Sequence, residues 1–143
     1  MQINIDYDSS VTSLETGDPT LFSEYTGAVN TAVQTLENDF TNPVTLTINV
    51  GWGESAGNTL DTHNGILAQN WANGENVVSL AMTGALLTSN ATTSAQEGFV
   101  ANLPSGLPDD AVYINEGEAT ALGLIGPTEN MGSVGLNSAY PYT

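Results

Sequence analysis

Four carboxylates lie within ten residues of one another in the second half of the chain: Asp109, Asp110, Glu116 and Glu118. Carboxylate oxygens are the hard ligands that calcium prefers, and calcium takes roughly six to eight of them in a flexible geometry. The Asp-x-Asp-x-Asp-Gly spacing of an EF-hand loop is absent, and Glu116 and Glu118 also suit the first turn of a helix, where acids complement the helix dipole. The group is therefore a candidate calcium site, with a solvated turn and helix start as the alternative.

His63 is the only imidazole in the chain, and the chain contains no cysteine. A catalytic zinc generally needs about three protein ligands of the His, Cys, Asp or Glu type and one open position. One histidine with scattered carboxylates lacks this arrangement, and the missing thiol also excludes disulfides and thiolate catalysis. We therefore expect no enzyme and no catalytic residue. For His63 we expect an exposed loop position, with a metal or proton-transfer role as the alternative.

Ser55 lies in a Gly-x-Ser-x-Gly pattern at residues 53–57, after an expected strand, which is the context of a nucleophile elbow. An elbow also needs a helix directly after the serine. The pair Asn58-Thr59 is a poor helix start, so we do not expect serine catalysis.

Other acidic and aromatic residues carry weaker signals. Asp6 and Asp8 share the polar face of the first expected strand, where we expect solvation, with a bridging cation as the alternative. Paired carboxylates also hydrolyse glycosides, but spacing singles out no pair among the 16 acids. Trp52 and Trp71 are able to stack on a sugar, yet buried packing is the commoner role of tryptophan in a small domain.

The chain carries 16 acidic residues and neither Lys nor Arg, so its 143 residues have a formal charge of -16 at pH 7. Phosphate backbones are held mainly by Lys and Arg, which excludes nucleic-acid binding and disfavours anionic membranes. Hydrophobic residues make up 40% of the sequence and the acids are spread singly, so we expect a folded domain and no disordered tail. An acidic chain without cysteine favours an extracellular bacterial location, where calcium neutralises carboxylates.

Two strand patterns and one helix pattern open the chain. Residues 2–8 alternate apolar and polar side chains, as in a half-buried strand. Asp18-Pro19 is a helix start, and apolar residues recur every three or four positions over residues 19–40, which predicts a long amphipathic helix. Residues 44–50 alternate again. A strand, a helix of about 20 residues and a strand predict a crossover with parallel strands.

The remaining elements are shorter. In chain order we expect loops at 9–17 and 54–64, short helices at 66–71, 77–87 and 93–103, a strand at 111–114, a helix capped by Asn115 and ended by Gly123, and a strand at 132–137. No stretch approaches the roughly 18 apolar residues of a membrane span, and no basic segment precedes the first strand. We therefore expect neither a membrane span nor a signal peptide.

Five segments carry a recognisable pattern: INI at residues 3–5, YDSS at 7–10, FTNPVTLTINVGWGE at 40–54, EATALGL at 118–124 and GSVGL at 132–136. In this order they resemble the amino-terminal region of a family of secreted bacterial zincin-like metalloproteases. The resemblance implies a sheet-and-helix subdomain ahead of an active-site helix with His-Glu-x-x-His, in which the histidines bind zinc and the glutamate acts as base. This sequence lacks that motif, so no catalytic residue of the family transfers to it.

We therefore expect an α/β (α+β) fold: a small twisted mixed sheet with one long amphipathic helix, like the amino-terminal subdomain of a zincin. A single domain is expected over residues 1–143, with a helical insertion and connector at 54–110. Without the active-site helix, one sheet face and one edge are uncovered, which favours association.

The expected function is a non-catalytic extracellular assembly module, which forms homo-oligomers or filaments or binds a complementing polypeptide. The alternatives are a processed fragment of an active secreted zinc metalloprotease and a calcium- or ligand-binding module. No cofactor is required, and calcium is the candidate ligand.

Overall fold

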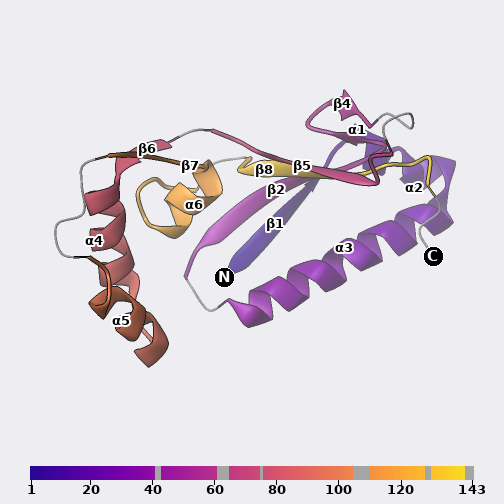
Figure 1. The fold of residues 1–143 in the computed structure, drawn as a ribbon. Helices are drawn as coiled ribbons and strands as arrows, with labels where there is room; N and C mark the ends of the chain where they lie inside the picture. The colour runs from indigo at the N-terminus through magenta and orange to yellow at the C-terminus, as the bar shows by residue number, and fades with distance from the viewer. Residues whose placement is uncertain (41–42, 61–64, 75, 105–109, 128–129, 141–143) are drawn as a thin grey trace. The chain divides into compact units, whose positions relative to one another are not determined.

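The computed structural model describes residues 1–40, 43–60, 65–74, 76–104, 110–127 and 130–140 (Figure 1). Contacts group the chain into two compact units: unit 1 comprises residues 1–73 and 127–143, and unit 2 comprises residues 74–126. The expectation of a single domain stays a prediction.

Unit 1 is built on a four-stranded mixed sheet with the strand order β1-β2-β8-β5. The first three strands are parallel and the last is antiparallel: β1 (Gln2–Tyr7), β2 (Thr45–Trp52), β8 (Gly132–Leu136) and β5 (Ala68–Ala72). Residues in register share a face of the sheet. Ile5 pairs with Ile48 and Val50 pairs with Val134, which gives the sheet one apolar face.

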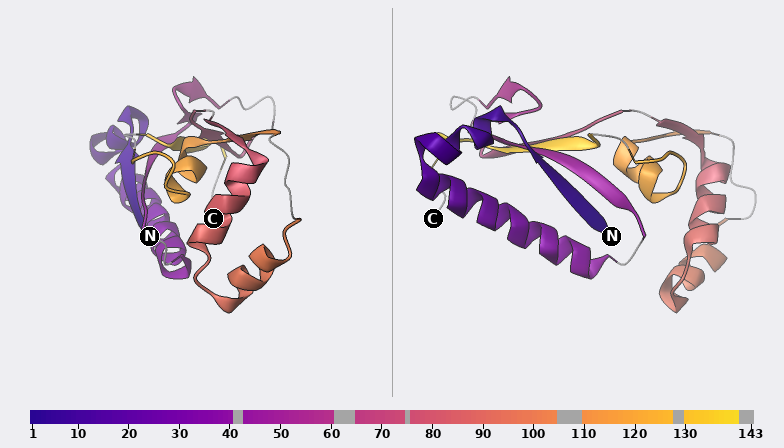
Figure 2. Two further views of the ribbon diagram at one scale, coloured as in Figure 1. Left: turned by 90° about the vertical axis from the view of Figure 1, so that its left-hand side faces the viewer. Right: turned by 180° about the vertical axis from the view of Figure 1, so that it is seen from behind.

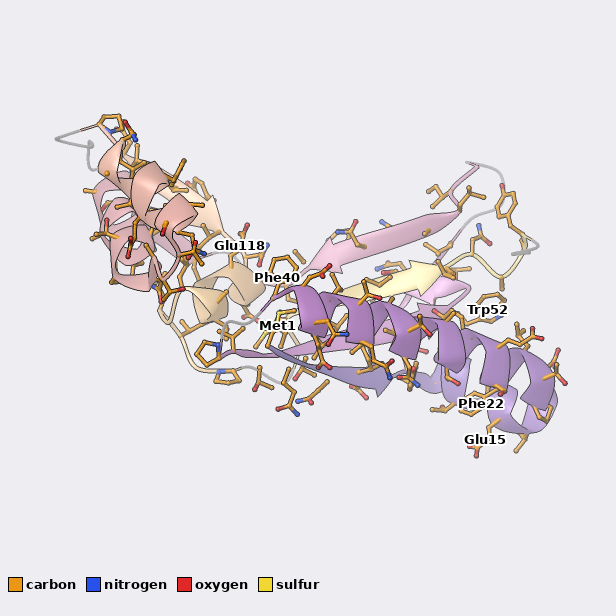
Figure 3. The ribbon with its side chains drawn as sticks, turned by 90° about the horizontal axis from the view of Figure 1, so that it is seen from below. Met1, Glu15, Phe22, Phe40, Trp52 and Glu118 are labelled. Atoms are coloured by element: carbon orange, nitrogen blue, oxygen red, sulfur yellow. The ribbon has the colours of Figure 1, made fainter. Side chains whose placement is uncertain are left out.

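Helix α3 (Pro19–Asp39) runs alongside the strands on this apolar face (Figure 2). The Asp18 side chain fixes its start by accepting a hydrogen bond from the Leu21 amide, and Pro19 occupies the first helical turn. Met1 and Phe40 meet at the other end of α3, where the Met1 amino group donates to the Phe40 carbonyl oxygen over 3.0 Å (Figure 3). Neither α3, with 21 residues, nor any other described helix is both long and apolar enough to cross a membrane.

The buried core of unit 1 lies near the start of α3 and consists of Val11, Tyr25 and Val50. The Tyr25 hydroxyl donates a hydrogen bond to the Gly51 carbonyl oxygen over 2.8 Å. The Tyr25 ring also meets Trp52 edge to face, with 5.1 Å between ring centroids. These contacts anchor the first half of α3 to the carboxyl end of β2.

Short elements close the carboxyl ends of the parallel strands. After β1 come α1 (Ser9–Thr12) and α2 (Leu14–Gly17), and after β2 comes the hairpin of β3 (Glu54–Ser55) and β4 (Asn58–Thr59). The hairpin crosses the sheet closely: a Cβ atom on Gly51 would lie 2.6 Å from the Glu54 carbonyl oxygen, and one on Gly135 would overlap the same atom. Both positions therefore require glycine.

Unit 2 combines a two-stranded antiparallel sheet with three helices. These elements are β6 (Asn76–Ser79), α4 (Leu80–Asn90), α5 (Ser94–Ala101), β7 (Ala111–Ile114) and α6 (Glu116–Ala121). Thr93 and Gln96 form a capping box at α5, and Asn115 and Glu118 form another at α6. Gly123 follows α6 with a positive φ of 74°, as helix-ending glycines do.

Much of the predicted architecture is confirmed: a small mixed sheet with parallel β1 and β2, one long helix, and β7, β8, α5 and α6 at their expected places. The likeness to a zincin subdomain stays a prediction.

Four local predictions are wrong. Residues 9–17 are helical because Asp8 caps α1. Residues 66–71 were expected as a helix, but strand β5 occupies this region because pairing with β8 satisfies its backbone, whereas so short a helix nucleates poorly. Residues 76–79 form β6, so the helix expected from residue 77 begins at Leu80. The expected loop at 54–64 contains the β3–β4 hairpin.

Candidate functional site

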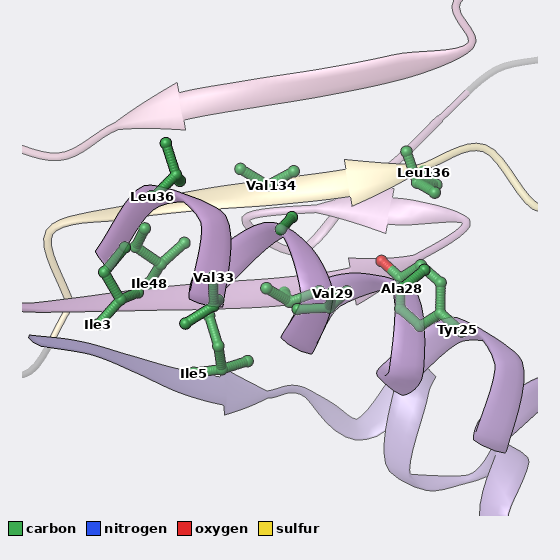
Figure 4. Close-up of a pocket in the computed structure, with 12 residues that line it drawn as sticks. Ile3, Ile5, Tyr25, Ala28, Val29, Val33, Leu36, Ile48, Val134 and Leu136 are labelled. Atoms are coloured by element: carbon green, nitrogen blue, oxygen red, sulfur yellow. The ribbon is translucent and has the colours of Figure 1, made fainter. Parts of the chain in front are cut away.

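An apolar groove of about 290 Å³ lies between α3 and the sheet (Figure 4). Its walls come from one side of α3 and from the apolar face of β1, β2 and β8. The lining residues are Tyr25, Ala28, Val29, Ala32, Val33 and Leu36 of α3, and Ile3, Ile5, Ile48, Val50, Val134 and Leu136 of the strands. The single polar atom among these side chains, the Tyr25 hydroxyl, is bonded to Gly51.

The groove exists because one helix is too narrow for this sheet. Strands lie about 4.8 Å apart and a helix with its side chains is about 10 Å wide, so one helix covers about two strands. Helix α3 contacts β1, and no other described helix of unit 1 runs along this face (Figure 1). The strip over β8 and β5 is therefore left open within unit 1.

Exposure values locate the open side of the groove. Leu36 on α3 is 43% exposed and Val134 on β8 is 39% exposed, whereas Val50 beneath the first half of α3 is only 4% exposed. The helix thus packs tightly at its beginning and leaves apolar side chains in water toward its end. Apolar side chains left in water along one groove are typical of a surface that contacts another protein.

A pair of carboxyl groups lies at the carboxyl end of the sheet, on the side of the β3–β4 hairpin. One Asp8 oxygen, Oδ1, accepts hydrogen bonds from the Ser10 amide at 2.8 Å, the Val11 amide at 3.2 Å and the Ser10 hydroxyl. The Ser10 hydroxyl in turn accepts from the Trp52 amide at 2.7 Å. The second Asp8 oxygen, Oδ2, is buried and has no hydrogen-bond partner among the described residues.

The Glu54 side chain reaches Asp8 from the hairpin. A protonated Glu54 donates a hydrogen bond to Asp8, and this bond, then partial burial and then the negative charge of Asp8 raise the pKa of Glu54. A proton on Glu54 would satisfy Asp8 Oδ2, so the pair fastens the hairpin to α1.

The pair corrects the expectation that Asp6 and Asp8 are both solvated: Asp6 is exposed, but Asp8 lies past the strand and caps α1. The sequence contained a signal for this role, since an aspartate before two serines is a typical N-cap. Glu54 carried no comparable signal, because its partner is 46 positions away in the sequence.

Two buried hydroxyl groups near this end also lack a partner among the described residues: those of Tyr7 and Ser55. Burial raises the pKa of the Tyr7 hydroxyl. Ser55 is 2% exposed and is followed by β4, without the helix that a nucleophile elbow requires. The serine pattern therefore lacks the geometry of an elbow.

The predicted calcium ligands are only partly described. Asp109 and also His63 lie outside the described residues. Asp110 is exposed beside β7, Glu118 accepts the Asn115 amide in its capping box, and Glu116 lies against Gly74. Among the described residues no three acidic or imidazole groups are close enough to share a metal ion. Calcium at Asp109, Asp110, Glu116 and Glu118 stays a prediction.

The sequence favoured buried packing for both tryptophans, and the structure places them differently. Trp52 packs against the core, but Trp71 on β5 is 54% exposed, so the expectation is wrong for Trp71. The physical reason is its position on the last strand of the sheet, on the face opposite the groove.

Comparison of the chain with protein-family models, curated proteins and solved structures finds no match. The resemblance to secreted metalloproteases therefore stays an expectation from the sequence.

Proposed function

We propose that this chain is a non-catalytic extracellular assembly module, and that further copies of the chain cover the open apolar face of unit 1. The observation that carries the proposal is the groove itself: every wall is apolar, yet Leu36 and Val134 remain 43% and 39% exposed. Apolar side chains that line one continuous groove and stay in water are typical of an interaction surface.

Energetics favour a covered state. Full burial of a Leu or Val side chain contributes about 1.5–3 kcal/mol, so completing the burial of two half-covered side chains contributes about 2 kcal/mol in total. The strip over β8 and β5 is about one helix wide. A protein segment fits such a strip better than a small molecule does, because the strip is open along its length.

Charge opposes assembly. Each copy carries a formal charge of -16, and no Lys or Arg offsets it. Salt screens exposed charges over about 8 Å at physiological ionic strength, and calcium binds carboxylates directly. Assembly of this chain is therefore promoted by calcium.

Size-exclusion chromatography with light scattering, over a concentration series with calcium or with a chelator, tests the proposal. We expect the mass to rise with concentration and to rise further with calcium. A monomer at every concentration in both conditions would refute it.

A further inference from the structure

The two edges of the unit 1 sheet are not equivalent. On β1 the amides of even-numbered residues face β2, as the bond from the Gln2 amide to the Val44 carbonyl oxygen shows, so the Ile3 amide faces outward. This amide donates to Glu37 Oε1 over 2.6 Å. The Glu37 carboxylate therefore occupies the β1 edge and hinders the addition of another strand there.

No side chain of the described residues bonds in this way to the outer edge of β5. Its sequence, Ala-Gln-Asn-Trp-Ala, contains no charge and no proline, although the chain as a whole is strongly acidic. Four of its five residues are exposed. Charged side chains and proline are the usual means by which edge strands avoid pairing, so β5 is open to a further strand.

The backbone of β5 shows which residues would make that contact. The Leu67 carbonyl oxygen accepts from the Asn137 amide, and the Asn73 amide donates to the Met131 carbonyl oxygen. Odd-numbered residues thus direct their backbone groups toward the rest of the sheet. The amides and carbonyls of Ala68, Asn70 and Ala72 consequently face outward.

We propose that β5 pairs antiparallel with β5 of a second copy, around a twofold axis through Asn70. This inference rests on the proposed assembly function and adds a second contact between copies, at the sheet edge beside the apolar face. A twofold axis perpendicular to the sheet places Asn70 opposite Asn70 of the second copy, and Ala68 opposite Ala72 of the second copy. All three outward-facing residues then form hydrogen-bonded pairs, and no other register uses the whole strand.

Three features favour a second copy as the partner. Pairing brings no like charges face to face, although each copy carries a formal charge of -16. Trp71, 54% exposed, gains Gln69 of the second copy as a cross-strand neighbour. The groove faces of both copies lie on the same side of the joined sheet, with Ala68, Asn70 and Ala72 of each copy between the two grooves. Since Glu37 blocks the β1 edge, strand pairing stops at a closed dimer and does not continue along a fibre.

A cysteine at the axis tests the pairing directly, because the chain has no other cysteine. Opposed Cα atoms in a hydrogen-bonded antiparallel pair lie about 5.5 Å apart, within disulfide range. Under mild oxidation we expect Asn70→Cys to form a covalent dimer at least about tenfold faster than Gln34→Cys, a control on the exposed side of α3. Equal rates for the two variants would overturn the proposal.

Asn70→Pro provides the second test. The Asn70 amide faces outward, so proline removes no hydrogen bond within the sheet, and circular dichroism should show an intact fold. We expect the dissociation constant of the dimer to rise about tenfold. Gln34→Ala is the control, because a proline at position 34 would break α3. If wild type associates and Asn70→Pro associates equally, β5 pairing is refuted while the assembly function stands. A wild-type chain that remains monomeric refutes both.

Discussion

Leu36 of α3 and Val134 of β8 face one groove from opposite walls, and 43% and 39% of their respective surfaces are exposed (Figure 4). A helix packed fully on a sheet would bury both side chains. Here the first half of α3 is anchored by Tyr25, while its second half borders a groove that unit 1 leaves open. The contrast between an anchored and an open half of one helix is the basis of the proposed assembly function.

Leu36→Asp should destabilise the monomer by only about 1 kcal/mol, because Leu36 is 43% exposed and only part of its side chain is buried within unit 1. Val50→Ala, which removes buried methyl groups at 4% exposure, should cost about 2 kcal/mol. Urea unfolding at low protein concentration measures both. A large loss for Leu36→Asp would mean that the groove is part of the folded core.

Tyr25→Phe should cost about 1 kcal/mol, because it removes the buried hydrogen bond to the Gly51 carbonyl oxygen and keeps the ring. Tyr113→Phe is the matched control, since Tyr113 is 68% exposed. Thermal unfolding of both variants should separate them by a few degrees. Equal melting temperatures would contradict the anchoring role of Tyr25.

Stability should depend on pH through Glu54. Its pKa is raised in the folded protein, chiefly by the hydrogen bond to Asp8, so the folded state holds the proton more tightly than the unfolded chain does. This contribution is fully present below the unfolded pKa of about 4.3 and is lost as pH rises through the raised folded pKa.

Glu54→Gln keeps a donor for Asp8 Oδ2 at every pH. It should therefore match wild type in acid and exceed it at pH 7 by less than about 1 kcal/mol, because solvent screens a contact of a partly buried side chain. Glu24→Gln removes the same charge from an exposed position of α3 and controls for general charge repulsion. Urea unfolding across the pH range measures the difference, and identical profiles for both variants would contradict the Asp8–Glu54 contact.

Calcium should raise the melting temperature more than sodium chloride of equal ionic strength does, by about 2–4 °C when calcium exceeds its dissociation constant about tenfold. Asp110→Asn should remove the calcium-specific increment, and Asp6→Asn, on the exposed face of β1, should retain it. Differential scanning calorimetry distinguishes the two. If sodium chloride raises the melting temperature as much as calcium does, the effect is charge screening and the prediction of specific calcium binding is wrong.

Local patterns in the sequence predicted the elements that depend on local physics. Alternation over β1 and β2 and the Asp18-Pro19 start of α3 each act within a few residues, and the structure confirms them. The helix prediction at residues 66–71 failed because the backbone partners of β5 lie in β8, from 60 residues (Ala72 to Gly132) to 68 residues (Ala68 to Leu136) further along the chain. Leu67 and Trp71 are four positions apart, which imitates a helix turn in a segment that pairs as a strand.

The groove followed from the sequence only in part. The apolar faces of β1 and α3 predicted a helix-on-sheet layer, but its open side depends on how many strands one helix must cover. That number is set by the addition of β8 and β5 to the sheet. The Asp8–Glu54 pair was likewise hidden, because it forms only when the β3–β4 hairpin folds back over Gly51.

Sedimentation equilibrium of wild type, Leu36→Asp and Gln34→Asp in calcium tests the central claim most directly. Both variants add one negative charge to α3, but only Leu36 lines the groove. We predict that wild type and Gln34→Asp associate with constants within about twofold of each other and that Leu36→Asp associates at least about tenfold more weakly, a difference of about 1.4 kcal/mol. Equal association of all three proteins, or monomers throughout, would contradict the account.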